Sequence, residues 1–271
     1  MAISLRGTVA CVTGGGRGIG KATAIALAQA GAKVFIGDID VDAAQEVADS
    51  LPGATAIQLD VSDADSFARF IERANEAGPL GVLINNAGIQ RTGEFVGQSL
   101  DTKHREMAIN VGGAINGMHF ALPGMLARNC GHIVNVSSMA GKMTVPGAAV
   151  YSASKFAVAS LSRTVRAEIA QSAVTITTVL PSAVQTELAA GLDLRGVPKA
   201  TPEEIAEEIV ASCQHGRAEV TLPKWLFPIG TIEQALPEKF GNWVKRAVGA
   251  QNRISADTPE SRQYQERLSK F

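Results

Sequence analysis

Seven short apolar stretches, rich in β-branched residues, recur along the first 222 positions of the chain, and longer segments with helical periodicity separate them. Apolar runs of this length are typical of parallel strands that are buried on both faces of a sheet. The predicted strands cover residues 8–13, 33–38, 54–60, 81–87, 131–138, 174–181 and 218–222. Their alternation with helical segments predicts consecutive βαβ units.

The segments between the strands carry helix signals of their own. Apolar residues recur at spacings of three and four over residues 19–30, and Gly31 follows where a helix would end. In "TPEE", Thr201 suits the N-cap, Pro202 suits the first helical position, and Glu204 completes a capping box. Both segments are therefore predicted to be crossover helices.

These elements predict an α/β fold: a Rossmann-type, doubly wound, parallel sheet of seven strands with helices on both faces. No linker rich in Pro, Gly or Ser divides the chain, so residues 1–222 are predicted to form a single domain. Ligands of such a sheet bind beyond the carboxyl ends of the strands. Candidate functional residues are therefore expected at those ends.

The 49 residues after Leu222 form a C-terminal extension that is predicted to be helical and amphipathic over residues 223–250. Pro228 and Pro237 should break it into short helices. We expect this extension, residues 223–271, to belong to the same domain or to make an oligomer contact. Five Lys or Arg against two Glu between 224 and 253 keep weak attachment to a membrane surface open as an alternative. From Ile254 onward the chain becomes polar, and we expect little order there.

Composition narrows the classes of function. Of the 271 residues, 19% are charged and 46% are hydrophobic, which is typical of a soluble globular protein. The formal net charge of −1 gives no general attraction to nucleic acid, and no apolar run is long enough for a membrane span. Three scattered cysteines favour the cytoplasm over an oxidising compartment. The four histidines show no metal-ligand spacing, so no metal site is expected.

A glycine-rich turn, "GGGRGIG" at residues 14–20, joins the first predicted strand to the first predicted helix. Glycines at such a turn allow the backbone to approach a pyrophosphate, and the N-terminus of the helix favours the anion. The turn predicts a dinucleotide site; tight packing alone is the alternative explanation. The expected contacts are Gly14, Arg17, Gly18, Ile19 and Gly20.

The second predicted strand ends at Asp38, a position from which a carboxylate can bind the ribose hydroxyls of an adenosine. The same carboxylate would repel a 2′-phosphate, and Ile39 adds no positive charge, so NAD is favoured over NADP. Arg17 keeps NADP open as an alternative because its guanidinium can pair with a phosphate. Asp38 in a solvated turn is the plain alternative.

Asp60 and Val61 follow the third predicted strand in the same way. The Asp60 carboxylate is placed to accept the adenine amino group. It is equally suited to the start of the next helix, near Ser62. Both interpretations of Asp60 stay open on the sequence alone.

Tyr151 and Lys155, in "YSASK", are four residues apart and would share one face of a helix. A free tyrosine has a pKa near 10, too high for a base at neutral pH. A positive charge about 4 Å away is worth roughly 4 kcal/mol at an effective dielectric of 20, about three pKa units. Lys155 is therefore expected to lower the pKa of Tyr151. A Tyr–Lys pair alone is also common on helix surfaces.

Five motifs in order, "TGGGRGIG", "NNAG" at 85–88, Asn110, "VSS" at 136–138 and "YSASK", resemble those of the short-chain dehydrogenase/reductase family. The resemblance covers residues 5 to 222 and matches the short, single-domain branch of that family. It implies a general acid/base role for Tyr151, a nicotinamide-ribose contact for Lys155, and a hydrogen bond from Ser138 to the substrate oxygen. Asn110 would anchor a water that connects Lys155 to solvent.

The resemblance also implies cofactor contacts along the cleft, at Asn86, Ala87, Gly88, Pro181, Val184 and Thr186. Ser182 departs from the glycine that usually follows the proline in this family. Residues 187–200 form a long predicted loop, rich in small and apolar residues, that is a candidate substrate lid. The apolar character of this loop suggests a hydrophobic substrate.

The function expected from these observations is NAD-dependent interconversion of a hydrophobic secondary alcohol and its ketone, by residues 1–222 as a dinucleotide-binding catalytic domain. An NADP-dependent carbonyl or 3-oxoacyl reductase is the alternative among enzymes. A non-catalytic, dinucleotide-sensing binding protein is the alternative from another class. The family resemblance also implies a homodimer or homotetramer.

Overall fold

The computed structural model describes residues 3–184, 188, 199–228, 232 and 259–268. Seven parallel strands form the central sheet in the order β3-β2-β1-β4-β5-β6-β9. Their bounds are β1 (Val9–Thr13), β2 (Lys33–Asp38), β3 (Thr55–Gln58), β4 (Leu80–Asn85), β5 (His132–Val136), β6 (Thr175–Pro181) and β9 (Glu219–Leu222). The predicted α/β class, the doubly wound topology and all seven strands are confirmed, with strand ends within three residues of the predicted ones.

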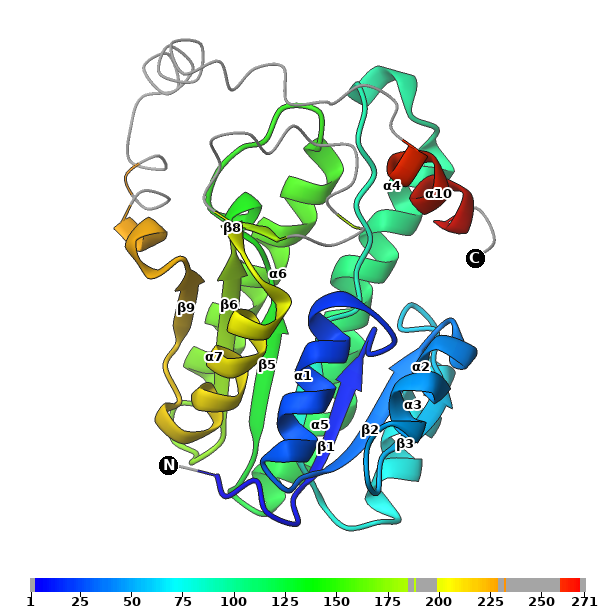
Figure 1. Cartoon of the computed structure of the whole chain (residues 1–271). Coiled ribbons are helices and arrows are strands. Elements are labelled where there is room, and N and C mark those ends of the chain that lie inside the picture. The colour runs from blue at the N-terminus through cyan, green and yellow to red at the C-terminus, as the bar shows by residue number, and fades with distance from the viewer. Residues whose placement is uncertain (1–2, 185–187, 189–198, 229–231, 233–258, 269–271) are drawn as a thin grey trace.

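Helices connect the strands and cover both faces of the sheet (Figure 1). They are α1 (Gly18–Gln29), α2 (Val41–Asp49), α3 (Ala64–Asn75), α4 (Leu100–Met107), α5 (Gly113–Ala127), α6 (Ala149–Glu168), α7 (Pro202–His215) and α10 (Pro259–Leu268). The shorter elements are η1 (Phe95–Gly97), the π-helical turn η2 (Ala108–Gly112), η3 (Met139–Gly141), η5 (Lys224–Leu226), and the pair β7 (Ala183–Val184) and β8 (Lys199–Ala200).

Two apolar cores lie on opposite faces of the sheet because side chains alternate along each strand. Val12, Ile36 and Ile84 are in register on neighbouring strands and pack under α1, α2 and α7. Residues one position earlier, such as Cys11 and Leu83, pack under α3 and α5 on the other face. The unbroken apolar runs of the sequence are thus explained by burial on both sides.

The local helix signals are also confirmed. Gly31 follows α1 with a φ of +88°, a conformation that costs glycine little. The Glu204 N–H donates to Thr201 Oγ1 (3.2 Å), and the Thr201 N–H donates to Glu204 Oε2 (2.9 Å), which completes the predicted capping box of α7.

The C-terminal part differs from expectation in one respect. Most of the predicted amphipathic extension, and most of the predicted lid at 187–200, lies outside the described residues. Beyond Ile254, where we expected little order, residues 259–268 form helix α10 beside α4 (Figure 1). Tyr264 is buried and fixes this helix to the body of the protein, so a tertiary contact overrides the polar composition.

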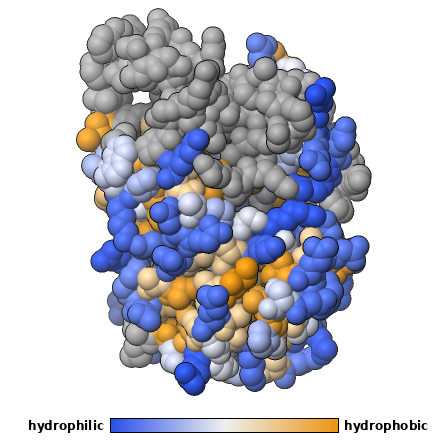
Figure 2. All heavy atoms as spheres, viewed as in Figure 1, coloured by the Kyte–Doolittle hydropathy of each residue, from blue (hydrophilic) through white to orange (hydrophobic). Residues whose placement is uncertain are grey.

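Figure 2 shows polar side chains over much of the described part of one face, with smaller apolar areas among them. None of the described helices combines the length and apolar character needed to cross a membrane.

Candidate active site

The candidate site lies where β1 and β4 end side by side, at the point where the strand order reverses. Chains leaving β1 and β4 here turn away to opposite faces of the sheet, which opens a crevice between them. The glycine turn follows β1, and "NNAG" follows β4. The two predicted dinucleotide motifs are therefore brought together.

The glycine turn is packed so closely that larger side chains would not fit. Gly14 has a φ of +64°, and a Cβ on it would lie 2.8 Å from the Cα of Ala87. A Cβ on Gly20 would collide with the carbonyl oxygen of Gly14. Gly18, with a φ of +51°, opens helix α1, and Ile19 is in its first turn. Without side chains at these glycines, the backbone can approach a bound pyrophosphate closely.

Thr13 and Asn86 hold the two motifs together. Asn86 donates from Nδ2 to the carbonyl oxygens of Thr13 (2.9 Å) and Gly14 (3.0 Å). The N–H groups of Asn86 and Ala87 both donate to Thr13 Oγ1, at 3.0 Å each. Sequence reasoning did not single out Thr13, although a hydroxyl at the end of the first strand, directly before the glycines, was the available signal.

Arg17 lies at the N-cap of α1, which has no side-chain cap, so this helix offers free N–H groups to an anion. The Arg17 guanidinium pairs with Asp40, Nη2 to Oδ2 at 2.8 Å. Burial raises the pKa of Asp40, but the hydrogen bonds from Arg17 and the Ala43 N–H, together with the positive charges of Arg17 and Arg267, leave the pKa below its usual value. The cation that kept NADP open is thus already paired with a carboxylate.

Asp38 ends β2 beside the glycine turn. Its Oδ2 accepts from the Gly16 N–H (2.9 Å), and its Oδ1 accepts from the Asp40 N–H (3.1 Å). Burial raises the pKa of Asp38, and the two backbone hydrogen bonds oppose that rise. The carboxylate is fixed in direction, while each oxygen keeps a further lone pair for a ribose hydroxyl.

Asp60 and Val61 lie at the corresponding end of the third strand. Asp60 Oδ1 accepts from the backbone N–H (2.9 Å) and the hydroxyl (2.6 Å) of Ser62, as the helix-start alternative expects. No hydrogen bond to Asp60 Oδ2 is recorded within the described residues, so an adenine contact there stays a prediction. Val61 is buried and packs against Gly113.

Ser138, Tyr151 and Lys155 come together beyond the carboxyl end of β5. Ser138 caps η3, and its hydroxyl forms a hydrogen bond with the Tyr151 phenol. Tyr151 and Lys155 lie one turn apart at the start of α6, and both are buried. The spacing in "YSASK" thus does place both side chains on one face.

The expected effect of Lys155 on Tyr151 is not found. Lys155 Nζ donates to the Val136 carbonyl oxygen (3.0 Å) and lies 5.5 Å from the centre of the Tyr151 ring. Burial raises the pKa of Tyr151, and only the hydrogen bond with Ser138 opposes it. Burial also lowers the pKa of Lys155 to about 8. Desolvation of both groups therefore outweighs the attraction assumed from their spacing.

Asn110 lies in the π-helical turn η2 and is buried next to Lys155. Its Oδ1 accepts from the Ile89 N–H (2.8 Å), and its Nδ2 donates to the Ile89 carbonyl oxygen (2.9 Å) and to Ser154 Oγ (3.0 Å). Gly88 faces both side chains, because a Cβ on it would lie 3.1 Å from Asn110 Oδ1 and 3.4 Å from Lys155 Nζ. A Cβ there would crowd the Asn110 side chain and make ordinary van der Waals contact with Lys155.

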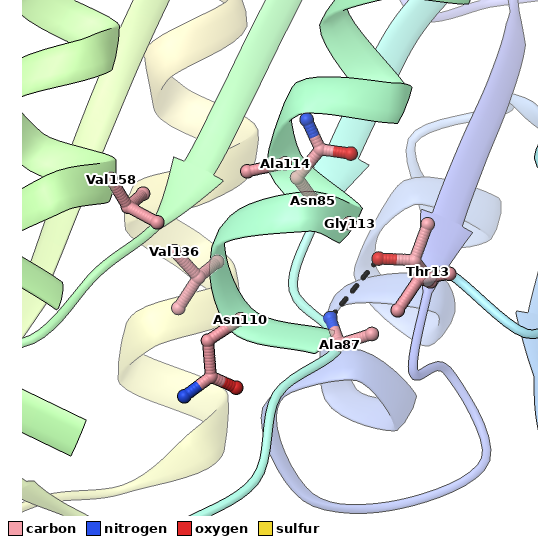
Figure 3. A pocket seen from close by; sticks show the side chains of 9 residues that line it. Thr13, Asn85, Ala87, Asn110, Gly113, Ala114, Val136 and Val158 are labelled. Carbon is pink, nitrogen blue, oxygen red and sulfur yellow. Dashed lines mark hydrogen bonds between the residues drawn. The ribbon is translucent and has the colours of Figure 1, made fainter. Parts of the chain in front are cut away.

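A small cavity lies behind this cluster (Figure 3). Asn110, Val136 and Val158 lie along one side of it, and Thr13 and Ala87 along the other (Figure 3). On this second side, the Ala87 N–H donates a hydrogen bond to Thr13 Oγ1. The lining of the cavity includes Ala87, one of the predicted cofactor contacts, and Asn110, one of the predicted catalytic residues.

The last predicted cofactor contacts lie at the end of β6. The Pro181 carbonyl oxygen accepts from Ser138 Oγ at 3.5 Å, and Val184 is buried in β7. Ser182 donates its N–H to the Leu222 carbonyl oxygen (2.8 Å), which keeps this turn closed although the usual glycine is absent. Thr186 lies outside the described residues.

Comparison with known proteins decides the family. The family model described as "short chain dehydrogenase" matches residues 8–195, more than half of the chain. The chain belongs to the short-chain dehydrogenase family. Oxidoreductase UcpA of Escherichia coli K12 is 35% identical over 211 residues, which cover 76% of this chain and 80% of the relative.

Probable oxidoreductase EphD of Mycobacterium tuberculosis H37Rv is 39% identical over 189 residues. This chain covers 32% of EphD, about a third of its length. A short-chain dehydrogenase/reductase from Burkholderia phymatum, solved in complex with NAD, superposes with a TM-score of 0.80 at 23% identity, over 94% of this chain and 99% of that one. This similarity shows the same fold.

Three further residues of this short-chain dehydrogenase, Tyr264, Arg91 and Glu106, lie near the candidate catalytic residues and were missed by sequence reasoning. Tyr264 in α10 accepts a hydrogen bond from the Gln90 N–H (3.1 Å). Arg91 Nη1 donates to Gln265 Oε1 (2.7 Å), and Glu106 is buried in α4. The chain has only two tyrosines, and both lie in this region, electrostatically coupled to each other. Their scarcity was the one signal in the sequence.

Replacing both Tyr264 and Gln265 with Ala should release α10, because the two described hydrogen bonds that fix it to Gln90 and Arg91 are lost. We expect KM for bulky substrates to rise at least several-fold, because two hydrogen bonds of about 1 kcal/mol each and the packing of a buried ring no longer hold α10 in place. Steady-state kinetics with one bulky and one small substrate measures this. Gln263→Ala, an exposed change on the same helix, is the control. Equal KM values in all three proteins would contradict a covering role for α10.

Proposed function

We propose that the protein is an NAD-dependent oxidoreductase that interconverts a hydrophobic secondary alcohol and its ketone, with Tyr151 as general acid/base. The observation that carries this proposal is the contact of Ser138 with Tyr151, next to Lys155, at the strand ends that also carry the glycine cradle. A proton-transferring group and a site shaped for pyrophosphate thus share one crevice.

The residues have distinct roles in this mechanism. A bound nicotinamide ring supplies the hydride acceptor or donor. Ser138 orients the substrate oxygen by a hydrogen bond, and Tyr151 transfers the proton to or from that oxygen. Lys155 Nζ keeps one N–H on the Val136 carbonyl oxygen and has others for the ribose. Burial of Tyr151 and Lys155 excludes water from the proton transfer.

The raised pKa of Tyr151 favours one direction at neutral pH. A neutral phenol has its proton ready for a carbonyl oxygen, which suits reduction of the ketone. Alcohol oxidation needs the phenolate, so its rate should rise as the pH rises. The loss of the Lys155 proton above about pH 8 should weaken cofactor binding and limit both directions.

The acidic side chains at the end of β2 support NAD as the cofactor. Asp38 presents a fixed carboxylate, Asp40 lies two residues away, and Arg17 is already paired with Asp40. The solved structure from Burkholderia phymatum contains NAD. NADP would bring a phosphate dianion beside two carboxylates, which disfavours the alternative NADP-dependent reductase.

Apolar side chains around Tyr151 support a hydrophobic substrate. Val145, Ala148 and Leu188 pack in one cluster with the Tyr151 ring, and Leu188 comes from the predicted lid. Several apolar side chains among the described residues are exposed on η1, α4 and α5: Phe95, Val96, Leu100 and Ile115. Exposed apolar side chains of this kind suit a contact with another subunit, so they support a homo-oligomer as the proposed assembly.

A substrate panel tests the proposed function. Steroid, aliphatic and acyl-chain alcohols and ketones, each assayed with NAD(H) and NADP(H) through reduced-nicotinamide absorbance, should give turnover with apolar substrates and NAD(H). Reduction should be fastest below about pH 8, where Lys155 keeps its proton and Tyr151 is neutral. Oxidation should rise with pH, because it needs the ionised phenol, until the loss of the Lys155 proton limits it. Dinucleotide binding without turnover anywhere in the panel would favour the sensing protein instead.

A further inference from the structure

Glu106 is a fully buried carboxyl group in α4 that takes no part in the proposed proton transfer. It lies in the last turn of α4, four residues before Asn110, and its side chain is 0% exposed. A carboxyl group is rarely buried to this extent unless a specific partner compensates for its lost hydration. The charge state of Glu106 therefore depends on the groups around it.

The hydrogen bonds of Glu106 are incomplete. Oε1 accepts from the Arg91 N–H (3.2 Å), whereas the buried Oε2 has no hydrogen-bond partner in the described part of the chain. Burial raises the pKa of Glu106 to about 7, and Arg91 and Lys155 act against that rise. The group consequently changes charge in the pH range in which the enzyme would work.

The groups that face Glu106 come from three other elements. Arg91 follows β4, Lys155 and Tyr151 belong to α6, and Tyr264 belongs to α10. The negative charge of Glu106 raises the pKa of Lys155 and also that of Tyr151. One buried carboxylate thus acts on both proposed proton-handling residues in the same direction.

Helix α10 lies against the segment next to this cluster. Tyr264 binds the Gln90 N–H, and Gln265 binds the Arg91 guanidinium, so the helix covers the segment that supplies the Glu106 hydrogen bond. Charges screened by bulk water affect each other little, whereas charges in a water-excluded region interact over several Å. Burial therefore lets the charge of Glu106 act on groups several Å away.

We propose that Glu106 is a positioning residue of the catalytic centre, whose buried negative charge, one helical turn from Asn110, keeps Lys155 as an ammonium in the neutral pH range. This inference rests on the proposed function. Glu106 acts through Lys155 and Tyr151 and does not itself contact the substrate. It therefore sets the pH at which the site changes state.

Glu106→Gln tests the inference, because it keeps the size of the side chain and an acceptor for Arg91 but removes the charge. The fall in ketone reduction at high pH and the rise in alcohol oxidation should both move to lower pH by roughly one unit, the effect of one charge several Å away in a partly screened site. NADH affinity, measured by fluorescence as a function of pH, falls at high pH as Lys155 loses its proton. In Glu106→Gln this fall should begin at a correspondingly lower pH. This second readout needs no turnover.

Two further variants make the result specific. Glu106→Leu also removes the charge, so it should move the pH profiles as far as Glu106→Gln does. It also replaces Glu106→Gln as the test if that variant does not fold. Asp101→Asn removes one negative charge from an exposed position of the same helix and should leave the profiles in place. Glu106 acts through its charge if the first two agree and the third does not move.

Other outcomes overturn the inference. A Glu106→Gln protein with lower rates but unmoved pH profiles would give Glu106 a packing role only. Movement in Glu106→Leu alone would assign the effect to the Arg91 hydrogen bond, and loss of folding in both variants would make the residue structural. A wild-type protein that binds no NADH at any pH would instead overturn the proposed function, and this inference with it.

Discussion

Replacing Tyr151 with Phe should reduce turnover by roughly 100- to 10,000-fold, the usual contribution of a general acid or base, while NADH affinity stays nearly unchanged. The change removes the hydroxyl that bonds to Ser138 and leaves the ring packed against Val145, Ala148 and Leu188. Lys155 keeps its hydrogen bond to the Val136 carbonyl oxygen, which does not depend on the phenol. The proposed ribose contact should therefore survive.

Measuring kcat with the best substrate of the panel and NADH affinity by fluorescence separates the two effects. Lys155→Ala provides the contrast, because it should weaken cofactor binding and turnover together. If the Tyr151→Phe protein kept most of its activity, Tyr151 would not be the acid/base and the proposed mechanism would be wrong.

The fold was predictable because its signals are local or periodic. The strands are buried on both faces, so their sequences are continuous apolar runs, and the layer of Val12, Ile36 and Ile84 follows from that burial. The capping box at Thr201 needs residues only three apart. Burial beyond residue 254 was missed because α10 depends on Gln90 and Arg91, about 170 positions away.

The sequence indicated which residues would come together at the candidate site, but it did not indicate how their surroundings would shift their pKa values. The i, i+4 spacing places Tyr151 and Lys155 on one face, but spacing does not tell how deeply the face is buried. Burial decides the direction of both pKa shifts. In "DTKHREM", Glu106 resembles a solvated helix charge, and only the positions of α6 and α10 make it a buried neighbour of Lys155.

The ion pair between Arg17 and Asp40 changes the basis for predicting the cofactor. From the sequence, Arg17 is available to a 2′-phosphate, and only Asp38 opposes it. In the structure, Asp40 uses the positive charge of Arg17, and Asp38 is fixed by the N–H groups of Gly16 and Asp40. The NADP alternative thereby loses its main support, although the choice of cofactor itself stays a prediction.

Combining Asp38→Ala with Ile39→Arg should move cofactor preference toward NADP by about 100-fold or more in the ratio of the two kcat/KM values. Two changes act together: the substitution removes hydrogen-bond acceptors that only an unphosphorylated ribose can use, and it supplies a guanidinium that pairs with a phosphate. Asp40 should continue to pair with Arg17, since that contact does not involve the Asp38 side chain. Steady-state kinetics with each cofactor at fixed substrate gives the ratio.

Asp42→Asn is the matched control, because Asp42 is exposed in the first turn of α2 and its loss changes the charge of the same region by one unit. Its preference should stay within a few-fold of wild type, since screening by water leaves exposed charges little influence on a bound phosphate. A shift in Asp42→Asn as large as in the double variant would show that general charge, and not the fixed Asp38 carboxylate, selects the cofactor. A wild-type enzyme that already prefers NADP in kcat/KM would reverse the assignment, because the acidic end of β2 would then fail to exclude the phosphate that it faces.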